Sequence, residues 1–136
     1  MKTKLVIFDL DGVLVEAKNI HFDALNSALG DDYAISWKEH LSTYDGLKTF
    51  QKLDMLSEKR GLPTELHKDI WESKQKLTLQ KLKELQPNQN LQQLMNALVD
   101  EGYKISVCSN SIRKTVLTVL SKLGLMEYMD YIISNE

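Results

Sequence analysis

The sequence has few cysteines and prolines, and its positive and negative charges nearly balance. The chain of 136 residues has one cysteine, Cys108, which cannot form an internal disulfide, so a reducing, cytoplasmic location is expected. Two prolines and six glycines exclude collagen-like and low-complexity classes. The 17 basic and 19 acidic residues give a formal net charge of -2, which excludes the clustered basic surface that a nucleic-acid partner requires.

Long hydrophobic runs are missing as well. Four apolar residues, 5–8, stand near the N-terminus, which is too few for the core of a signal peptide, and no later run approaches the length of a membrane span. We therefore expect no membrane partner. The 43% hydrophobic and 26% charged residues are typical of a globular domain that buries a core.

The apolar residues instead form short runs and helical stripes. Residues 5–8 predict a strand buried on both faces of a parallel sheet. Residues from about 19 to 85 are rich in Lys, Glu, Leu and Gln, and their apolar stripes predict about four helices. The rest of the chain predicts, in order, a helix over 91–101, a strand over 104–108, a helix over 112–123 and a strand over 131–133.

This order predicts an α/β fold, a partial Rossmann-like parallel sheet with an inserted all-helical cap subdomain. The expected boundaries are 1–16 and 86–136 for the incomplete α/β core and 17–85 for the cap. An insertion of that length is too long for one crossover, so we expect it over the carboxyl edge of the sheet, where such folds bind ligands.

Two carboxylates directly follow the first predicted strand. Asp9 and Asp11 flank Leu10, and Gly12 permits a turn that other residues resist. In a sharp turn both carboxylates can point to one site, where a bound cation or a shared proton would relieve their repulsion. A hard, oxygen-ligated cation such as Mg²⁺ is expected. The alternative is a turn whose N–H groups these carboxylates merely satisfy.

A second polar segment follows the predicted strand at 104–108. The hydroxyl of Ser109, the backbone N–H of Asn110 and the start of the next helix could converge on an anion, and helix N-termini favour phosphate. The alternative is that Ser109 or Ser111 only caps the helix. We expect Ser111 to cap the helix and Ser109 to bind phosphate. Because both groups must reach one ligand, the two strands are expected to be neighbours.

These two segments resemble a known family. Residues 8–14, Phe-Asp-Leu-Asp-Gly-Val-Leu, and residues 107–111, Val-Cys-Ser-Asn-Ser, resemble the first two motifs of the haloacid dehalogenase-like superfamily. The inserted helices resemble the small cap of its phosphoglycolate phosphatase and β-phosphoglucomutase branch. His21 stands where that branch often has a histidine, and Gly46 resembles a glycine of the cap loop that faces the active site.

The resemblance implies hydrolysis of a small phosphorylated metabolite through an aspartyl-phosphate. Asp9 would be the nucleophile, and Asp11 would act first as general acid and then as general base. The Asp9 carboxylate and the Asp11 backbone carbonyl would bind Mg²⁺, and Ser109 and Asn110 would hold a phosphate oxygen. Dehalogenases of the superfamily lack the second aspartate, so Asp11 favours phosphate chemistry.

Two departures from the family matter. Thr49 stands where the sugar-phosphate mutases carry a phosphate-gripping arginine, which favours a phosphatase over a phosphomutase. Family members also continue past a segment like residues 132–136 with a lysine and an acidic pair, and the sequence ends at Glu136 before either. We expect a truncated phosphatase that is weak or inactive as a 136-residue chain, or else a non-catalytic binding module derived from the family.

The remaining candidates have simpler interpretations. An incomplete sheet leaves one side of the first strand without a neighbour, which favours a homodimer or strand exchange. His21 is interpreted as a surface or hinge residue, Cys108 as part of the core, and Lys74 as part of the solvated side of a cap helix.

Overall fold

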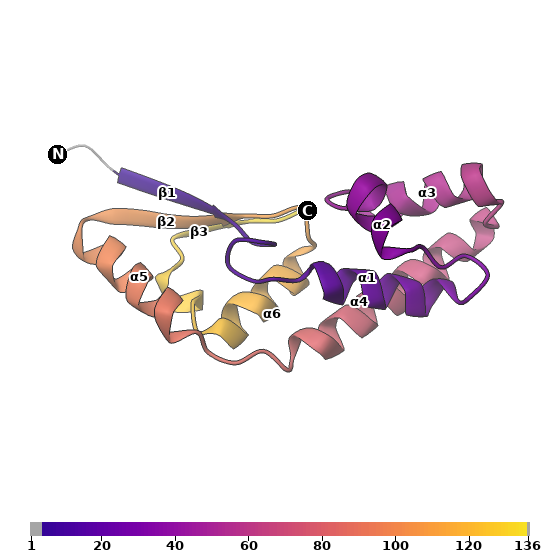
Figure 1. Ribbon diagram of the computed structural model, residues 1–136. Coiled ribbons are helices and arrows are strands. Elements are labelled where there is room, and N and C mark those ends of the chain that lie inside the picture. Colours follow the sequence, from indigo (N-terminus) through magenta and orange to yellow (C-terminus); the bar gives the residue numbers. More distant parts are fainter. Residues whose placement is uncertain (1–3, 136) are drawn as a thin grey trace. The chain divides into compact units, whose positions relative to one another are not determined.

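The computed structural model describes residues 4–135, which form the α/β fold that the sequence predicts (Figure 1). Residues 1–3 of the first predicted core segment, and Glu136, lie outside the described residues. No helix within the described part combines the length and apolar character that a membrane crossing requires. The elements in chain order are β1 (Lys4–Asp9), α1 (Lys18–Leu29), α2 (Trp37–Glu39), the π-helical turn η1 (His40–Tyr44), α3 (Thr49–Arg60), the 3₁₀ turn η2 (Thr64–Leu66), α4 (His67–Leu82), α5 (Gln89–Asp100), β2 (Tyr103–Cys108), α6 (Arg113–Leu123), the 3₁₀ turn η3 (Met126–Tyr128) and β3 (Tyr131–Ile133).

The chain divides into two compact units. The core unit consists of Met1–Ala17 with Lys81–Glu136, and the helical unit consists of Lys18–Gln80. Helix α4 passes through the second boundary and ends at Leu82. The boundary proposed from the sequence, between residues 85 and 86, falls in the loop after that helix.

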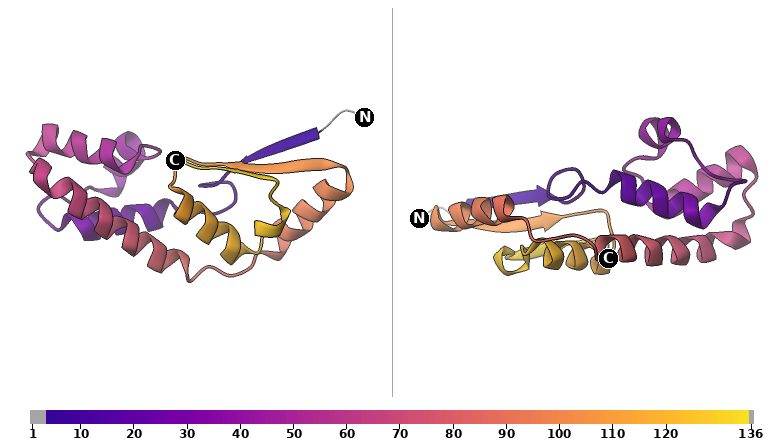
Figure 2. Two further views of the ribbon diagram at one scale, coloured as in Figure 1. Left: turned by 180° about the vertical axis from the view of Figure 1, so that it is seen from behind. Right: turned by 60° about the horizontal axis from the view of Figure 1, so that its bottom comes forward.

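The core unit is built on a parallel sheet with the strand order β1-β2-β3. The register pairs Asp9 with Cys108, and Cys108 with Ile133, so the three strands end close together at one edge. This pairing confirms that the strand ending at Asp9 lies beside the strand that precedes Ser109. Helices α5 and α6 cover the same face of the sheet (Figures 1 and 2).

One face of the sheet remains open among the described residues. Ile105 and Val107 are buried on the covered face, whereas Leu5 and Ile7 are 49% and 58% exposed on the other. The prediction that the first strand is buried on both faces is therefore wrong for this part of the chain, and Cys108 is exposed instead of lying in the core. We call the exposed side of the sheet the open face, and its apolar side chains are Leu5, Ile7, Cys108, Tyr131 and Ile133.

We expect the 136-residue chain to associate with a second copy through the outer edge of β1. Antiparallel pairing of two β1 strands centred on Val6 would place Leu5 of each copy opposite Ile7 of the other and bury part of the open face. Sedimentation at roughly micromolar concentration should then give a dimer, and Ile7→Lys, which puts a charge on that edge, should give a monomer. A monomeric unsubstituted chain at that concentration would contradict this pairing.

The helical unit has a hydrophobic core of its own. Leu25 of α1 and Leu53 and Leu56 of α3 are fully buried at its centre, and Ile70 of α4 packs against them. Ring contacts continue this packing outward, since Phe50 of α3 stacks on Trp71 of α4 with ring centroids 5.7 Å apart. The unit therefore holds its three long helices together by side chains that all lie within residues 18–80.

Candidate active site

Asp9 and Asp11 lie on a tight turn at the carboxyl end of β1. Leu10, between them, is completely buried, and its carbonyl oxygen accepts hydrogen bonds of 3.0–3.3 Å from the backbone N–H groups of residues 13–15. Gly12 has φ +79°, a left-handed conformation that favours glycine. Its N–H donates a hydrogen bond of 2.7 Å to the carbonyl oxygen of Val15. The buried side chain of Leu10 and these backbone hydrogen bonds thus hold the turn in one conformation, while Asp9 is exposed and Asp11 is partly exposed.

One oxygen of the Asp9 carboxylate is oriented by the turn. Its Oδ1 accepts a hydrogen bond from the backbone N–H of Leu10 at 2.7 Å. The structure gives Oδ2 no hydrogen bond from residues 4–135, so this oxygen can face a reactant. The alternative considered above was that the carboxylates only accept hydrogen bonds from N–H groups of the turn. For Asp9 this role accounts for one of the two carboxylate oxygens.

Ser109 follows β2 at the same edge of the sheet. It lies one residue past Cys108, the register partner of Asp9. The backbone N–H of Ser109 donates to the carbonyl of Ile133 at 2.9 Å, and its Oγ accepts a hydrogen bond from the N–H of Ser111 at 3.0 Å. The side chain is buried, and a hydroxyl that accepts one bond can still donate its hydrogen to an oxyanion.

The loop between β2 and α6 differs from the expectation in one respect. Helix α6 begins at Arg113 and its N-cap is Ile112, whose side chain makes no capping hydrogen bond. The prediction that Ser111 caps this helix is wrong, because the helix starts one residue later and Ser111 instead donates its N–H to Ser109. Asn110 is exposed in this loop.

The described residues offer a Mg²⁺ ion part of a coordination shell. Among residues 4–135, no three His, Cys, Asp or Glu side chains gather closely enough to enclose a metal ion. The turn after β1 presents a carboxylate from Asp9 and a backbone carbonyl from Asp11, which are the hard oxygen donors that Mg²⁺ prefers. Because this ion keeps several waters and is often held by one or two carboxylates with a substrate phosphate, the two residues fit such a site.

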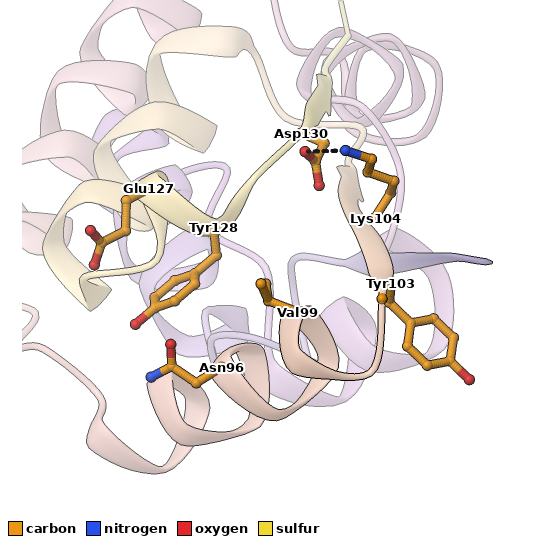
Figure 3. A pocket seen from close by; sticks show the side chains of 8 residues that line it. Asn96, Val99, Tyr103, Lys104, Glu127, Tyr128 and Asp130 are labelled. Atoms are coloured by element: carbon orange, nitrogen blue, oxygen red, sulfur yellow. Dashed lines mark ion pairs between the residues drawn. The ribbon is translucent and has the colours of Figure 1, made fainter. Parts of the chain in front are cut away.

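A hollow of about 480 Å³ lies at the other end of the sheet (Figure 3). It is lined by residues of α5, the start of β2 and the segment that leads into β3. Asp130 anchors this region, because its Oδ2 accepts the N–H of Ile105 at 2.8 Å and its Oδ1 lies 3.8 Å from Nζ of Lys104. Open α/β sheets bind ligands at the carboxyl ends of their strands, so this hollow is separate from the site at Asp9.

The helical unit contains buried basic side chains that the sequence analysis missed. Lys52 and Lys74 are each 5% exposed, and His40 is 1% exposed. Nζ of Lys74 lies 3.3 Å from Nδ1 of His21, which joins α4 to α1. The interpretation of Lys74 as part of a solvated helix face is therefore wrong. From Ile70 to Leu82, buried residues of α4 recur at four-residue intervals, and this spacing could have revealed the position of Lys74.

His40 begins the π-helical turn η1, and its ring is in an unusual environment. Both ring nitrogens are buried without a hydrogen-bond partner among the described residues. Burial lowers the pKa of His40 below its usual range, and the positive charge of Lys52 lowers it further. His21 and Lys18 have the same effect, whereas Asp45, whose Oδ1 lies 3.9 Å from Nε2, opposes it. The imidazole is therefore neutral at neutral pH.

The lowered pKa of His40 predicts that acid destabilises the protein. Below the unfolded-state pKa of about 6.5, the unfolded chain binds a proton that the folded chain refuses, so stability falls as the pH falls. His40 can contribute at most about 1.4 kcal/mol per pH unit to this slope. Urea unfolding of the wild type and His40→Phe between about pH 7.5 and 5.5 should show a shallower slope for the variant. Equal slopes would contradict the assignment.

Comparison with known proteins decides the family. The sequence model of the haloacid dehalogenase-like hydrolases matches residues 6–136. The chain belongs to this family. The match includes both segments of the candidate site, the turn at Asp9 and the loop at Ser109, and it agrees with the resemblance seen in the sequence.

Similar proteins are longer than this chain. A phosphoserine phosphatase of Archaeoglobus fulgidus is 28% identical over 135 residues, which are 98% of this chain and 34% of that protein. A crystal structure of a predicted phosphoglycolate phosphatase from Haemophilus somnus matches with a TM-score of 0.81 and 22% identity, covering 98% of this chain and 63% of that one. A β-phosphoglucomutase from Clostridium difficile matches with a TM-score of 0.79 and 24% identity, covering 99% and 62%. The chain thus spans about a third of the curated relative and less than two thirds of these structures, which share its fold.

Proposed function

We propose that this chain carries the nucleophile and the phosphate-binding residues of a phosphatase that acts on a small phosphorylated metabolite. The main support is the shared sheet edge, where Asp9 ends β1 and Ser109 follows the register partner of Asp9 on β2. Neighbouring strands lie about 4.8 Å apart, so one phosphoryl group can contact both side chains. The carboxylate is exposed and the hydroxyl is held in place, as a nucleophile and a binding group require.

The proposed reaction has two steps on Asp9. A carboxylate oxygen of Asp9 attacks phosphorus, the bond from phosphorus to the ester oxygen breaks, and the protonated carboxyl of Asp11 gives its proton to that leaving oxygen. Water then attacks the phosphorus of the aspartyl-phosphate, and the carboxylate of Asp11 takes a proton from it. The bond between phosphorus and Asp9 breaks, which releases inorganic phosphate and restores the carboxylate.

The remaining groups bind and orient the phosphoryl oxygens. The hydroxyl of Ser109 donates a hydrogen bond to one of them, and Asn110 donates to the same oxygen. Asp9 and the backbone carbonyl of Asp11 would hold Mg²⁺, which when bound neutralises charge on the phosphoryl oxygens. The buried side chain of Leu10 keeps the two aspartates at fixed positions on their turn.

Hydrolysis is preferred here to phosphoryl transfer between sugar hydroxyls. Thr49 begins α3 and is buried, and it cannot supply the bidentate charge of the arginine that the mutase resemblance leads us to expect. The names of two relatives, a phosphoserine phosphatase and a predicted phosphoglycolate phosphatase, point to small phosphorylated metabolites as the substrate class.

Trapping the phosphorylated enzyme tests this proposal. Residues 1–136, joined to the part of the Haemophilus somnus phosphatase that they do not cover, are incubated with acetyl phosphate and Mg²⁺ and then treated with borohydride, which reduces an acyl phosphate to an alcohol. Mass spectrometry should find the reduced residue at Asp9 only when acetyl phosphate was present, and Asp9→Asn should give none. Reduction at another residue, or at none, would oppose the mechanism and favour a non-catalytic binding module.

A further inference from the structure

We propose that the helical unit contains a second nucleophile, Ser57, which reacts with activated acyl esters and has His67 as its general base. The side chains that carry the proposal are Ser57 and Asp54 of α3 and His67, the first residue of α4. They lie within residues 18–80, so this reactivity is independent of the chemistry assigned to Asp9.

The alignment of a hydroxyl, an imidazole and a carboxylate is the first argument. Oγ of Ser57 lies 2.7 Å from Nε2 of His67, within the distance over which a base takes a hydroxyl proton. On the other side of the ring, Nδ1 lies 3.6 Å from Oδ1 of Asp54. A carboxylate near Nδ1 favours the tautomer that carries its hydrogen there, which leaves Nε2 as the acceptor. This is the order of groups that activates a nucleophilic serine.

The orientation of the Ser57 side chain is the second argument. A helical serine or threonine can bond back to the carbonyl four residues earlier, as Thr78 of α4 does at 2.8 Å. Ser57 points forward instead, because Gly61, with φ +70°, ends α3 and returns the chain past it. Its Oγ is 2.7 Å from the carbonyl oxygen of Leu62 and also from His67, so two acceptors face a hydroxyl that has one hydrogen. That hydrogen can turn from the carbonyl to the imidazole while Oγ stays in place.

The burial of the three residues suits these roles. His67 is 9% exposed, so its ring is held against Ser57, whereas Ser57 is partly exposed and can be reached by a reagent. His67 also begins α4, and the first turn of a helix stabilises negative charge such as that which develops on the attacked group. The side chain of Asp54 is 74% exposed, so Asp54 is a positioning residue that can be replaced without disturbing the core.

The proposed step transfers an acyl group to Ser57. Oγ attacks the carbonyl carbon of the ester while the hydroxyl hydrogen passes to Nε2 of His67. The bond from that carbon to the leaving oxygen then breaks, and the leaving oxygen takes the proton from Nε2. The products are an acyl-serine and an alcohol. A fluorophosphonate imitates this step: the bond from Oγ to phosphorus forms, fluoride leaves, and the proton passes through Nε2 to water.

Labelling with a fluorophosphonate tests the proposal in the 136-residue chain. Mass spectrometry should find the adduct on Ser57, and Ser57→Ala should remove it. His67→Gln should slow labelling by about 100-fold or more, because general-base catalysis commonly contributes about 10²- to 10⁴-fold. The matched control is Ser121→Ala, which removes an exposed serine that also precedes a glycine C-cap at a helix end. This control should label within about twofold of the wild type.

A variant at the exposed Asp54 keeps the test decisive if His67→Gln fails to fold. Asp54→Asn should slow labelling by about tenfold or more, because an amide can stabilise the wrong tautomer of His67. Glu58→Gln, at an exposed position one helical turn later, should label within about twofold of the wild type. Nitrogen-15 NMR of the His67 ring should place its hydrogen on Nδ1 in the wild type and show a change in Asp54→Asn.

Four outcomes would overturn the proposal. These are the absence of any adduct, an adduct on Ser109 or another residue in place of Ser57, labelling of folded His67→Gln or Asp54→Asn at the wild-type rate, and a wild-type ring hydrogen on Nε2. The last outcome would make the imidazole a donor to Ser57, and a donor cannot take the proton of the hydroxyl.

Discussion

A chimera that joins residues 1–136 to the uncovered part of the Haemophilus somnus phosphatase is expected to hydrolyse p-nitrophenyl phosphate far faster than residues 1–136 alone. The uncovered part is the portion of that protein outside the match with this chain. Losing one preorganised charge stabiliser commonly costs about 100- to 1,000-fold in rate, so a gain of at least this size is expected.

The reason lies in groups that residues 1–136 do not supply. The family resemblance implies that a lysine and an acidic pair follow a segment like residues 132–136 in family members. Asp9 and Asp11 alone supply few of the oxygen ligands that Mg²⁺ requires. Such losses are not additive, but together they should leave residues 1–136 barely above the uncatalysed rate. Turnover with Mg²⁺ by residues 1–136 alone that matches the chimera would contradict this account. The same chimera without Mg²⁺ is the control.

Asp9→Asn in the chimera is expected to lower kcat by at least about 10⁴-fold, because removing a nucleophile commonly costs between about 10⁴- and 10⁶-fold. An asparagine side chain keeps an oxygen that can accept the N–H of Leu10, so the turn should stay folded while the attacking carboxylate is lost. Asp100→Asn makes the same chemical change at an exposed position on α5 and should leave kcat within about twofold.

The comparison of these two variants tests the role of Asp9 separately from that of the other proposed residues. A chimera whose rate is unaffected by Asp9→Asn would show that the aspartate is not the nucleophile, whatever its position at the sheet edge. Circular dichroism of both variants distinguishes loss of the nucleophile from loss of the fold, since the helices of the two units dominate that signal.

That β1 and β2 are neighbours could be predicted from the sequence because the residues that follow them share one chemistry. Asp9 and Ser109 each follow a short apolar run, and two such groups reach one ligand only if their strands are neighbours, as β1 and β2 are. Burial of the first strand could not be predicted in the same way. An apolar run such as residues 5–8 shows that both faces can be buried, whereas the described residues cover one of them.

The buried lysines were missed because apolar residues alone were used to locate the buried face of each helix. On α3 the apolar residues include Phe50, which is half exposed, whereas the polar Lys52, next to Leu53 in the sequence, is buried. On α4, four buried residues recur every fourth position, and two of them are polar. That line consists of Ile70, Lys74, Thr78 and Leu82. Helical spacing identifies these positions only when polar residues are allowed to be buried.

The hydrogen bond from the N–H of Ser109 to the carbonyl of Ile133 has a consequence for local unfolding. It joins the loop between β2 and α6, residues 109–112, to β3, which has three residues and lies at the edge of the sheet that the described residues form. Short edge elements open more readily than central ones, and each opening of β3 releases the amide of Ser109 to solvent. Hydrogen exchange at the amide of Ser109 should therefore follow the opening of β3, so any residue that stabilises this strand also stabilises the loop of residues 109–112.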